Sequence, residues 1–246
     1  MRWAPESSPL PLGRDQVHVW RARLGVDDDR YRVCHALLTP EEHQRAARYA
    51  FDEPRRRFVV ARGTLRALLA AYVGVPAADL VFAYGEHGKP RLTTPETDTT
   101  FNLSHSGDRV LLAVARERDV GVDVERTRRK VNWEAISRRF FAVGEQAALF
   151  DLPDEDRRGA FFRCWTRKEA FMKATGLGVT YGLRSFSVSL APGQAPDLRW
   201  LAAGRPEDWG LADADPDDEH AGAVCAAGRD WRPVYLTVHG GDDVRQ

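Results

Sequence analysis

Alternating and periodic apolar positions along the chain predict strands and helices in an order that occurs twice. In the first half, these patterns predict strands at 17–24, 80–83, 100–103 and 110–115, a helix that begins at Thr39-Pro40, and a long helix over 55–72. In the second half, they predict strands at 120–125, 185–190, 221–226 and 234–238, with helices at 133–141, 144–150 and 157–175. This repeated order indicates an α+β fold with two lobes.

The polar run 116–119 separates the two halves, so we expect an N-terminal lobe over residues 1–117 and a C-terminal lobe over residues 118–246. A length of 246 residues with 43% hydrophobic residues is enough to bury a sizeable core. Because the two lobes already supply an interface to each other, we expect a monomer.

Charge and cysteine content exclude several classes of protein. Lys plus Arg and Asp plus Glu both number 36, so no overall field draws the chain to nucleic acid or to an anionic membrane. Three distant cysteines without metal spacing fit reduced thiols. No stretch reaches the ~18 apolar residues of a membrane span, and no apolar run follows the first residues. We therefore expect a cytoplasmic protein.

Two segments place carboxylates where a metal ion could bind. In the strand Gly121-Val122-Asp123-Val124-Glu125, Asp123 and Glu125 face the same side while the valines point into the core. An isolated motif of this kind is usually the solvent face of a strand. In the second segment, Glu169 and Lys173 lie four residues apart on a helix rich in aromatic residues, where embedded charges need partners. Paired carboxylates are ligands that hard divalent cations prefer.

Three further features suggest contacts to phosphate. Ser104 and His105 follow a predicted strand, where a loop would leave polar groups free to bind a ligand. The turn at 85–90 presents Lys89. Seven arginines crowd the first lobe's helices, and guanidinium pairs phosphate oxygens in bidentate fashion. They are Arg45, Arg48, Arg55, Arg56, Arg57, Arg62 and Arg66.

Taken together, these segments resemble the Sfp-type 4′-phosphopantetheinyl transferases over nearly the full chain. The first family signature is similar to the turn 88–90 and to Phe101-Asn102-Leu103-Ser104-His105-Ser106-Gly107. The second is similar to 121–125, and the third to Trp165-Thr166-Arg167-Lys168-Glu169-Ala170-Phe171-Met172-Lys173. The resemblance implies two similar lobes related by a pseudo-two-fold axis, each with a small, mostly antiparallel sheet packed against helices.

The resemblance also implies roles for particular residues. Coenzyme A would lie between the lobes, with Mg2+, or Mn2+ in its place, held by Asp123, Glu125 and Glu169 against its pyrophosphate. Lys173 and the residues of the first signature would contact its phosphates or its adenosine end. These are Lys89, Ser104 and His105, with Arg45 and Arg62 as further candidates.

The implied reaction transfers 4′-phosphopantetheine from coenzyme A to a serine of an acyl or peptidyl carrier protein and releases adenosine 3′,5′-bisphosphate. Glu169 or Glu125 would accept the proton of the serine hydroxyl, while the metal and Lys173 stabilise the leaving pyrophosphate charge. Two other interpretations stay open at this point. One is a non-catalytic module that binds coenzyme A or a nucleotide, and the other is a metal-dependent phosphohydrolase.

Segment 126–141 is a candidate docking surface for the carrier protein. It follows the second signature at once and carries six bases against Glu134 alone, a net charge of +5. Carrier proteins of this class are acidic around the modified serine, so the charges are complementary. Trp133 and Ile136 would form an apolar contact stripe or would instead pack into the second lobe. The six bases are Arg126, Arg128, Arg129, Lys130, Arg138 and Arg139, and the segment ends at Phe141.

Overall fold

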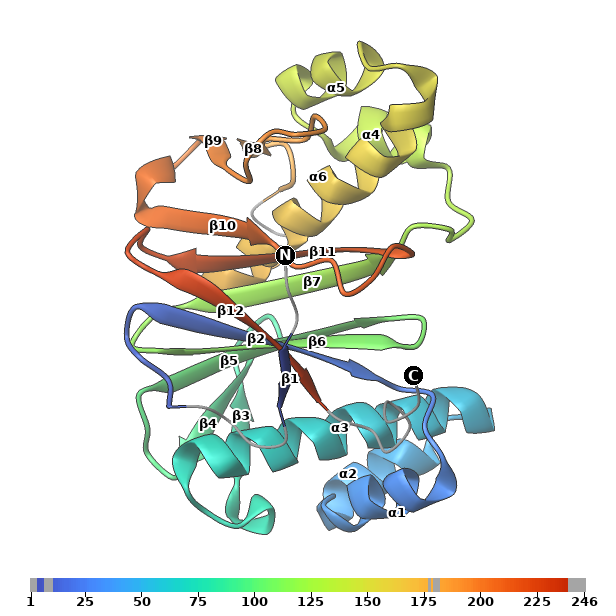
Figure 1. The fold of residues 1–246 in the computed structure, drawn as a ribbon, viewed down its shortest axis with the longest axis vertical. Helices are drawn as coiled ribbons and strands as arrows, with labels where there is room; N and C mark the ends of the chain where they lie inside the picture. The colour runs from blue at the N-terminus through green and yellow to red at the C-terminus, as the bar shows by residue number, and fades with distance from the viewer. Residues whose placement is uncertain (1–3, 7–10, 177, 179–181, 239–246) are drawn as a thin grey trace.

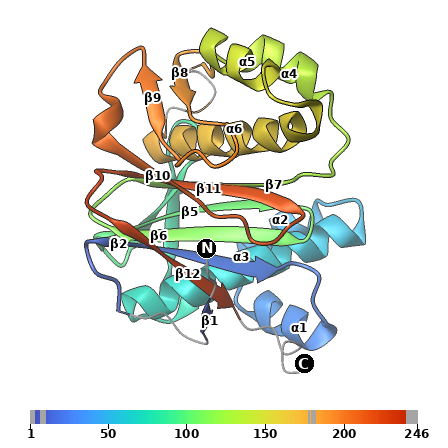
Figure 2. The ribbon, with the colours of Figure 1, turned by 45° about the horizontal axis from the view of Figure 1, so that its top comes forward.

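A computed structural model describes residues 4–6, 11–176, 178 and 182–238. Two sheets pack face to face, and each carries helices on its outer face, so the layers follow the order helix, sheet, sheet, helix (Figures 1 and 2). This arrangement confirms the α+β class and the presence of small sheets packed against helices. No helix among the described residues is both long enough and apolar enough to cross a bilayer.

The larger sheet has five strands in the order β1-β12-β2-β6-β5. These strands are β1 (Ala4–Glu6), β2 (Gln16–Arg23), β5 (Thr99–Ser106), β6 (Arg109–Arg116) and β12 (Arg232–Val238). Strands β2, β6 and β5 are antiparallel neighbours, whereas β12 runs parallel to β2, and β1 runs parallel to β12. Both faces of β2 and β6 carry buried apolar residues, because the sheet lies between helices and the second sheet.

The smaller sheet is antiparallel and has the order β10-β11-β7. Its strands are β7 (Val120–Arg126), β10 (Trp209–Asp213) and β11 (His220–Ala227). Val122 and Val124 point from β7 toward the larger sheet, where they pack with Val19 and Ala113. Two further strand pairs are β3 (Val81–Tyr84) with β4 (Pro90–Thr94), and β8 (Phe186–Val188) with β9 (Leu198–Leu201).

Three helices cover the outer face of the larger sheet: α1 (Asp28–Ala36), α2 (Pro40–Ala47) and α3 (Asp52–Val73). The start predicted at Thr39-Pro40 is confirmed, because Thr39 and Glu42 form a reciprocal capping box at the first turn of α2. Helix α3 places Leu65 and Leu69 against the sheet and ends at Gly74, which has a positive φ of 71°.

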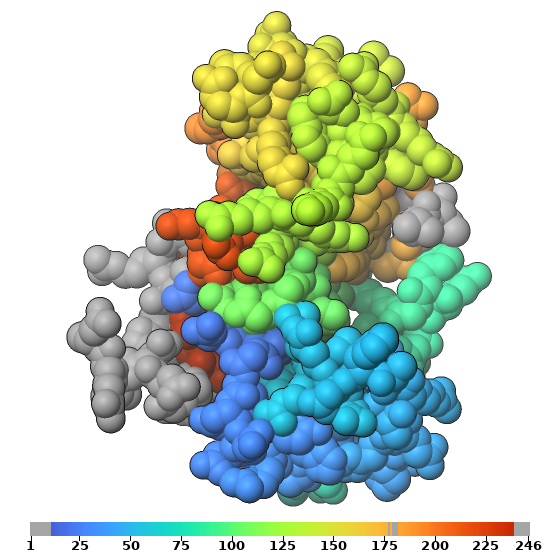
Figure 3. All heavy atoms as spheres, turned by 90° about the vertical axis from the view of Figure 1, so that its right-hand side faces the viewer, coloured from blue at the N-terminus to red at the C-terminus, as the bar shows by residue number. Residues whose placement is uncertain are grey.

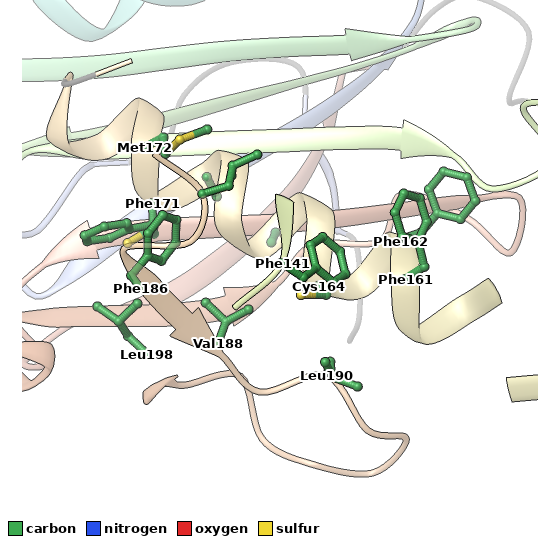
Figure 4. Packing of buried hydrophobic residues seen from close by; sticks show 14 of the residues in the cluster. Phe141, Phe161, Phe162, Cys164, Phe171, Met172, Phe186, Val188, Leu190 and Leu198 are labelled. Atoms are coloured by element: carbon green, nitrogen blue, oxygen red, sulfur yellow. The ribbon is translucent and has the colours of Figure 1, made fainter. Parts of the chain in front are cut away.

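Helix α6 (Asp154–Thr175) covers the outer face of the smaller sheet, with α4 (Trp133–Phe140) and α5 (Val143–Phe150) beside it. Its aromatic side chains Phe161, Phe162 and Phe171 pack with Phe186 and Val188 of β8 in one apolar cluster, as Figure 4 shows. The prediction that this helix is embedded is confirmed. Lys168 is completely buried and donates hydrogen bonds of 2.8 Å to both carboxylate oxygens of Glu145, so this charge of the third signature belongs to the core.

Most predicted elements are present, but the pairing of the last strand differs from the prediction. The strand expected at 234–238 forms β12, which joins the sheet of the first half instead of packing in the second lobe. Helix α1 and strands β1, β4, β9 and β10 are additional elements. The division at residues 117 and 118 stays a prediction, and the parallel pairing of β12 with β2 crosses it.

Candidate active site

The close approach of helix α6 to strand β7 depends on Gly121. A Cβ atom built on Gly121 would lie 2.2 Å from the carbonyl oxygen of Ala170 and 2.2 Å from the backbone nitrogen of Ala174. No side chain fits in that space, so the glycine allows the helix backbone to rest directly on the strand. Asp123 is two residues further along the same face of β7, and it therefore points toward the last two turns of α6.

Asp123, Lys173 and Ser104 form a compact hydrogen-bonded group between strands β5 and β7 and helix α6. The Nζ of Lys173 lies 2.7 Å from Oδ1 of Asp123 and 2.9 Å from Oγ of Ser104. The Ser104 hydroxyl donates to Oδ1 of Asp123 at 2.8 Å. The Asp123 side chain is 6% exposed and that of Lys173 is 30% exposed, so the carboxylate is shielded from bulk water while the ammonium group stays partly accessible. One residue from each of the three signatures meets the others here, and all three are residues that the sequence analysis names for the metal or the phosphates.

One oxygen of this group has no partner among the residues that the structure describes. The Oδ2 atom of Asp123 is buried and accepts no hydrogen bond from any described residue. A buried carboxylate oxygen without a partner is costly, because it has lost its hydration and gained nothing in exchange. Such an atom fits a site that a cation completes.

Glu125 lies at the end of β7, close to the surface. Its Oε2 accepts a hydrogen bond of 2.8 Å from the hydroxyl of Ser106, and the guanidinium of Arg129 lies 3.3 Å from its Oε1. Glu125 is therefore held from two sides, by strand β5 and by the segment that follows β7.

Glu169 has a pKa raised to about 7. Burial in the protein is the largest cause, and the negative charges of Asp123 and Glu125 add to it, while Lys173 opposes it. The three carboxylates named from the sequence therefore share one electrostatic environment. A carboxyl group that titrates near neutral pH is suited to accept a proton.

The three carboxylates suit a divalent cation by their chemistry, but their present spacing does not yet form a coordination site. Within the described part of the chain, no three Asp, Glu, His or Cys side chains converge closely enough to hold an ion as they stand. The ammonium of Lys173 occupies Oδ1 of Asp123. A cation would nevertheless satisfy the orphan Oδ2 of Asp123 and would relieve the repulsion that raises the pKa of Glu169.

Lys89 lies on the hairpin between β3 and β4 and reaches the end of α6. Its Nζ donates to the carbonyl oxygen of Ala174 at 2.6 Å and lies 3.4 Å from Asp119. Burial lowers the pKa of Lys89, and Asp119 partly offsets that effect. A cation at a helix C-terminus is favourable, so Lys89 ties the first half of the chain to the end of α6.

Strand β5 extends further than the sequence predicted, and this changes the place of His105. The strand continues to Ser106, so His105 lies within it and points to the opposite face from Ser104 and Ser106. The pKa of His105 is lowered by loss of hydration and by the positive charges of Lys173 and Arg57. Arg57 of α3 thus lies within electrostatic range of His105.

The two arginines named from the resemblance differ in their surroundings. Arg62 is paired with the buried carboxylate of Glu42, which also accepts a hydrogen bond of 2.6 Å from Arg66. The Arg62 guanidinium stacks over Phe82 at 4.2 Å from the ring centroid. Arg45 is exposed on α2 and lies 5.2 Å from the centroid of the Phe58 ring. Glu42 carries one negative charge against two guanidinium groups, so the charge of Arg62 is only partly balanced, whereas Arg45 forms no ion pair within the described residues and is open to a ligand.

Segment 126–141 lies beside the site, with its apolar residues turned inward. Trp133 stacks with Phe150 and lies tilted against Phe161, and Ile136 packs against the same apolar cluster, so both are partly buried against the core of the second half. The charged residues of this segment stay on the surface. Figure 3 shows the side of the molecule on which the segment lies above helices α2 and α3. Arg128 forms an ion pair of 3.0 Å with Glu219.

Comparison with known proteins gives matches along most of the chain. The model of the 4′-phosphopantetheinyl transferase superfamily matches residues 119–225, and the model of the 4′-phosphopantetheinyl transferase N-terminal region matches residues 26–117. The 4′-phosphopantetheinyl transferase HetI of Nostoc is 38% identical over 235 residues, which cover 95% of this chain and 97% of that protein. This chain belongs to the 4′-phosphopantetheinyl transferase family.

Further family members are similar over shorter stretches. The 4′-phosphopantetheinyl transferase psf-1 of Bacillus pumilus is 36% identical over 71% of this chain and 75% of its own length. A 4′-phosphopantetheinyl transferase of Bacillus subtilis is 30% identical over 87% of this chain and 92% of its own length. The holo-[acyl-carrier-protein] synthase of Thermotoga maritima matches at a TM-score of 0.37 and 21% identity, over 46% of this chain and 64% of its own.

Sequence reasoning missed part of how this transferase holds strand β7. Asn102 accepts a hydrogen bond of 2.9 Å from the backbone nitrogen of Val122, Ser104 donates to Asp123, and Ser106 donates to Glu125. Alternate residues of β5 thus reach successive positions of β7. The period of two in 102–106 is a signal for this, and the strand runs on past residue 103, where the sequence pattern predicts a loop.

Proposed function

We propose that this chain transfers the 4′-phosphopantetheine group of coenzyme A to a serine of acyl or peptidyl carrier proteins and releases adenosine 3′,5′-bisphosphate. The similarity to HetI over 95% of the chain carries this proposal, because that protein is named as a 4′-phosphopantetheinyl transferase. The meeting of Asp123, Glu169 and Lys173 between β7 and α6 supports it.

Coenzyme A would lie between the two proposed lobes, with its pyrophosphate at Lys173 and Ser104. The Lys173 ammonium and the Ser104 hydroxyl lie side by side, and the Lys173 side chain is 30% exposed, so a phosphate can approach it. His105 and Lys89 would meet the remaining phosphate and the adenosine end. Arg45 is available for the 3′-phosphate, and Arg57, which pairs with Glu53 on the same helix and whose charge acts on His105, is a further candidate.

Asp123, Glu125 and Glu169 would hold Mg2+, or Mn2+ in its place. The bound ion would supply a Lewis acid that neutralises charge on the pyrophosphate oxygens as the anhydride bond breaks. Lys173 would stabilise the same developing charge through its ammonium group. Glu169, which shares the electrostatic environment of Asp123 and Lys173, is the group we assign to accept the proton of the carrier serine, directly or through metal-bound water, and Glu125 is the alternative.

The surface beside this site suits an acidic partner. Segment 126–141 begins where β7 ends, and its bases remain exposed after Trp133 and Ile136 are packed inward. Docking would therefore depend on charge, which steers and orients the partner, more than on an apolar stripe. We propose that the chain acts as a monomer, since β12 completes the larger sheet from within the same chain.

The experiment is mass spectrometry of several apo-carrier proteins incubated with this protein, coenzyme A and Mg2+. We expect each accepted carrier to gain the mass of one phosphopantetheine, and a carrier with its serine replaced by alanine to gain none. Consumption of coenzyme A without any carrier would instead identify a phosphohydrolase. Binding of coenzyme A with neither outcome would identify a binding module.

A further inference from the structure

The turn between β5 and β6 lies at the outer end of the proposed metal site and is held by a loop that the mechanism does not use. Ser106 is the last residue of β5, and its hydroxyl donates to Glu125 while it accepts from the backbone nitrogen of Arg126. Gly107 follows with a φ of 61°, which a short hairpin connection requires. The position of Ser106, and with it that of Glu125, therefore depends on what fixes this turn.

Asp217 makes the contacts that fix it. Its Oδ2 accepts a hydrogen bond of 2.6 Å from Nε of Arg109, the first residue of β6. Its Oδ1 lies 2.7 Å from Nδ1 of His220 and accepts from the backbone nitrogen of Glu219 at 2.9 Å. We call Asp217 with Arg109 and His220 the Asp217 clamp. It joins the larger sheet to the loop that precedes β11.

The His220 end of the clamp is buried against the turn. The His220 side chain is 2% exposed, and its Nε2 makes no hydrogen bond to any described residue. A Cβ built on Gly107 would lie 3.5 Å from this nitrogen and 3.5 Å from Cδ of Arg126. The imidazole ring therefore packs on the turn at the point where the chain passes Glu125. A buried ring nitrogen without a hydrogen bond lowers stability, so its presence here indicates that the ring is held in this position for another reason.

The same loop also holds the residues that follow Glu125. The carbonyl oxygen of Glu219 accepts from the backbone nitrogen of Thr127 at 2.8 Å and from its hydroxyl at 2.9 Å. Strand β11 pairs His220 with Arg126. Glu125 is thus bracketed, with Ser106 on one side and the anchored segment 126–127 on the other, and Asp217 bonds to the elements that carry both.

We propose that Asp217 is a positioning residue for the active site: through the β5–β6 turn and Ser106 it fixes the carboxylate of Glu125 where a divalent cation would bind. This inference rests on the metal site of the proposed function. Groups that orient metal ligands from behind raise affinity because the ligands then lose less freedom on binding. Asp217 touches neither the ion nor the substrate in this arrangement.

The test compares Asp217→Asn with Asp218→Asn in the full-length protein. Both remove one negative charge from the same loop, but Asp218 is exposed and makes no hydrogen bond or ion pair within the described residues that would hold the turn. Direct Mn2+ binding is measured by electron paramagnetic resonance, without turnover. We expect Asp217→Asn to weaken Mn2+ binding about tenfold, the lower end of the range for such groups, and Asp218→Asn to leave it unchanged.

Two further measurements separate positioning from general stability. Ser106→Ala removes the link to Glu125, so Asp217 should have no further effect on Glu125 in its presence. The double variant Ser106→Ala/Asp217→Asn should therefore bind Mn2+ as tightly as whichever of the two single variants has the lower Mn2+ affinity. In the transfer assay, Asp217→Asn should raise the Mg2+ concentration at half-maximal rate while the KM for coenzyme A stays constant. Equal Mn2+ affinity in Asp217→Asn and Asp218→Asn, or additive effects with Ser106→Ala, would overturn the proposal. Mn2+ binding without transfer by the unaltered protein would reject the proposed function and leave this inference standing.

Discussion

Replacing Gly121 by alanine should separate helix α6 from strand β7 and thereby take the site apart. The new Cβ would lie 2.2 Å from two backbone atoms of α6, at Ala170 and Ala174, and neither can rotate away. Ordinary contact requires about 3.5 Å, so the helix must retreat by about 1 Å or more. The bond of 2.7 Å between Lys173 and Asp123 would then exceed hydrogen-bond length.

The expected magnitudes follow from that displacement. Overpacking of a rigid contact costs about 1 to 3 kcal/mol or more, and for a chain of this size each kcal/mol lowers Tm by roughly 2 to 4 °C. We therefore expect Tm to fall by about 5 to 10 °C. Misplacing catalytic groups by about 1 Å costs about a hundredfold in rate. Thermal unfolding and the carrier-modification rate measure the two effects.

A matched control lies in the same helix. At Gly159 of α6, no atom of the described residues lies within 4 Å of a built Cβ, so Gly159→Ala should raise stability by about 0.5 to 1 kcal/mol and leave the rate unchanged. If Gly121→Ala instead unfolded at the wild-type temperature and retained wild-type activity, the close contact between α6 and β7 would not be what positions the site.

Three other predictions concern the carboxylate, the 3′-phosphate and the partner. The pKa of Glu169 is about 7 in the folded protein against an ordinary value of 4.5, so the folded state holds this proton more tightly and stability should fall as pH rises from 4.5 to about 7. At pH 8 and without divalent cations, Glu169→Gln should be more stable than wild type by roughly 1 to 3 kcal/mol in denaturant unfolding. The variant should have no transfer activity. Equal stabilities of the two proteins would contradict the raised pKa. Dephospho-coenzyme A should bind more weakly than coenzyme A by about 1.5 to 3 kcal/mol for each charged hydrogen bond lost. Arg57→Ala should reduce this difference between the two binding free energies in calorimetry. If the difference were as large in the variant as in wild type, Arg57 would not contact the 3′-phosphate. Arg128→Glu should raise the KM for an acidic carrier and leave coenzyme A binding unchanged, with wild-type rates falling as salt is added; unaltered carrier kinetics would place docking elsewhere. Arg129 is unsuited to that test because it contacts Glu125 directly.

The sequence by itself determined the elements and the chemistry of the site. The start of α2 at Thr39-Pro40 and the end of α6 at Gly176 are local signals, since capping and positive φ depend on neighbouring residues alone. The alternation in 121–125 likewise placed Asp123 and Glu125 on one face of a strand. Residue type and spacing were enough to name the carboxylates, because these properties are written in the chain.

The tertiary structure decided which of these groups meet and what each one does. Lys168 and Lys173 lie on one helix, yet the first pairs with Glu145 in the core and the second with Asp123 in the site. The pairing of β12 with β2 joins residues more than 200 positions apart, which no local pattern encodes. The clamp at Asp217 depends on such pairing too, because contacts between distant segments follow from how sheets and helices pack and not from the sequence of any one element.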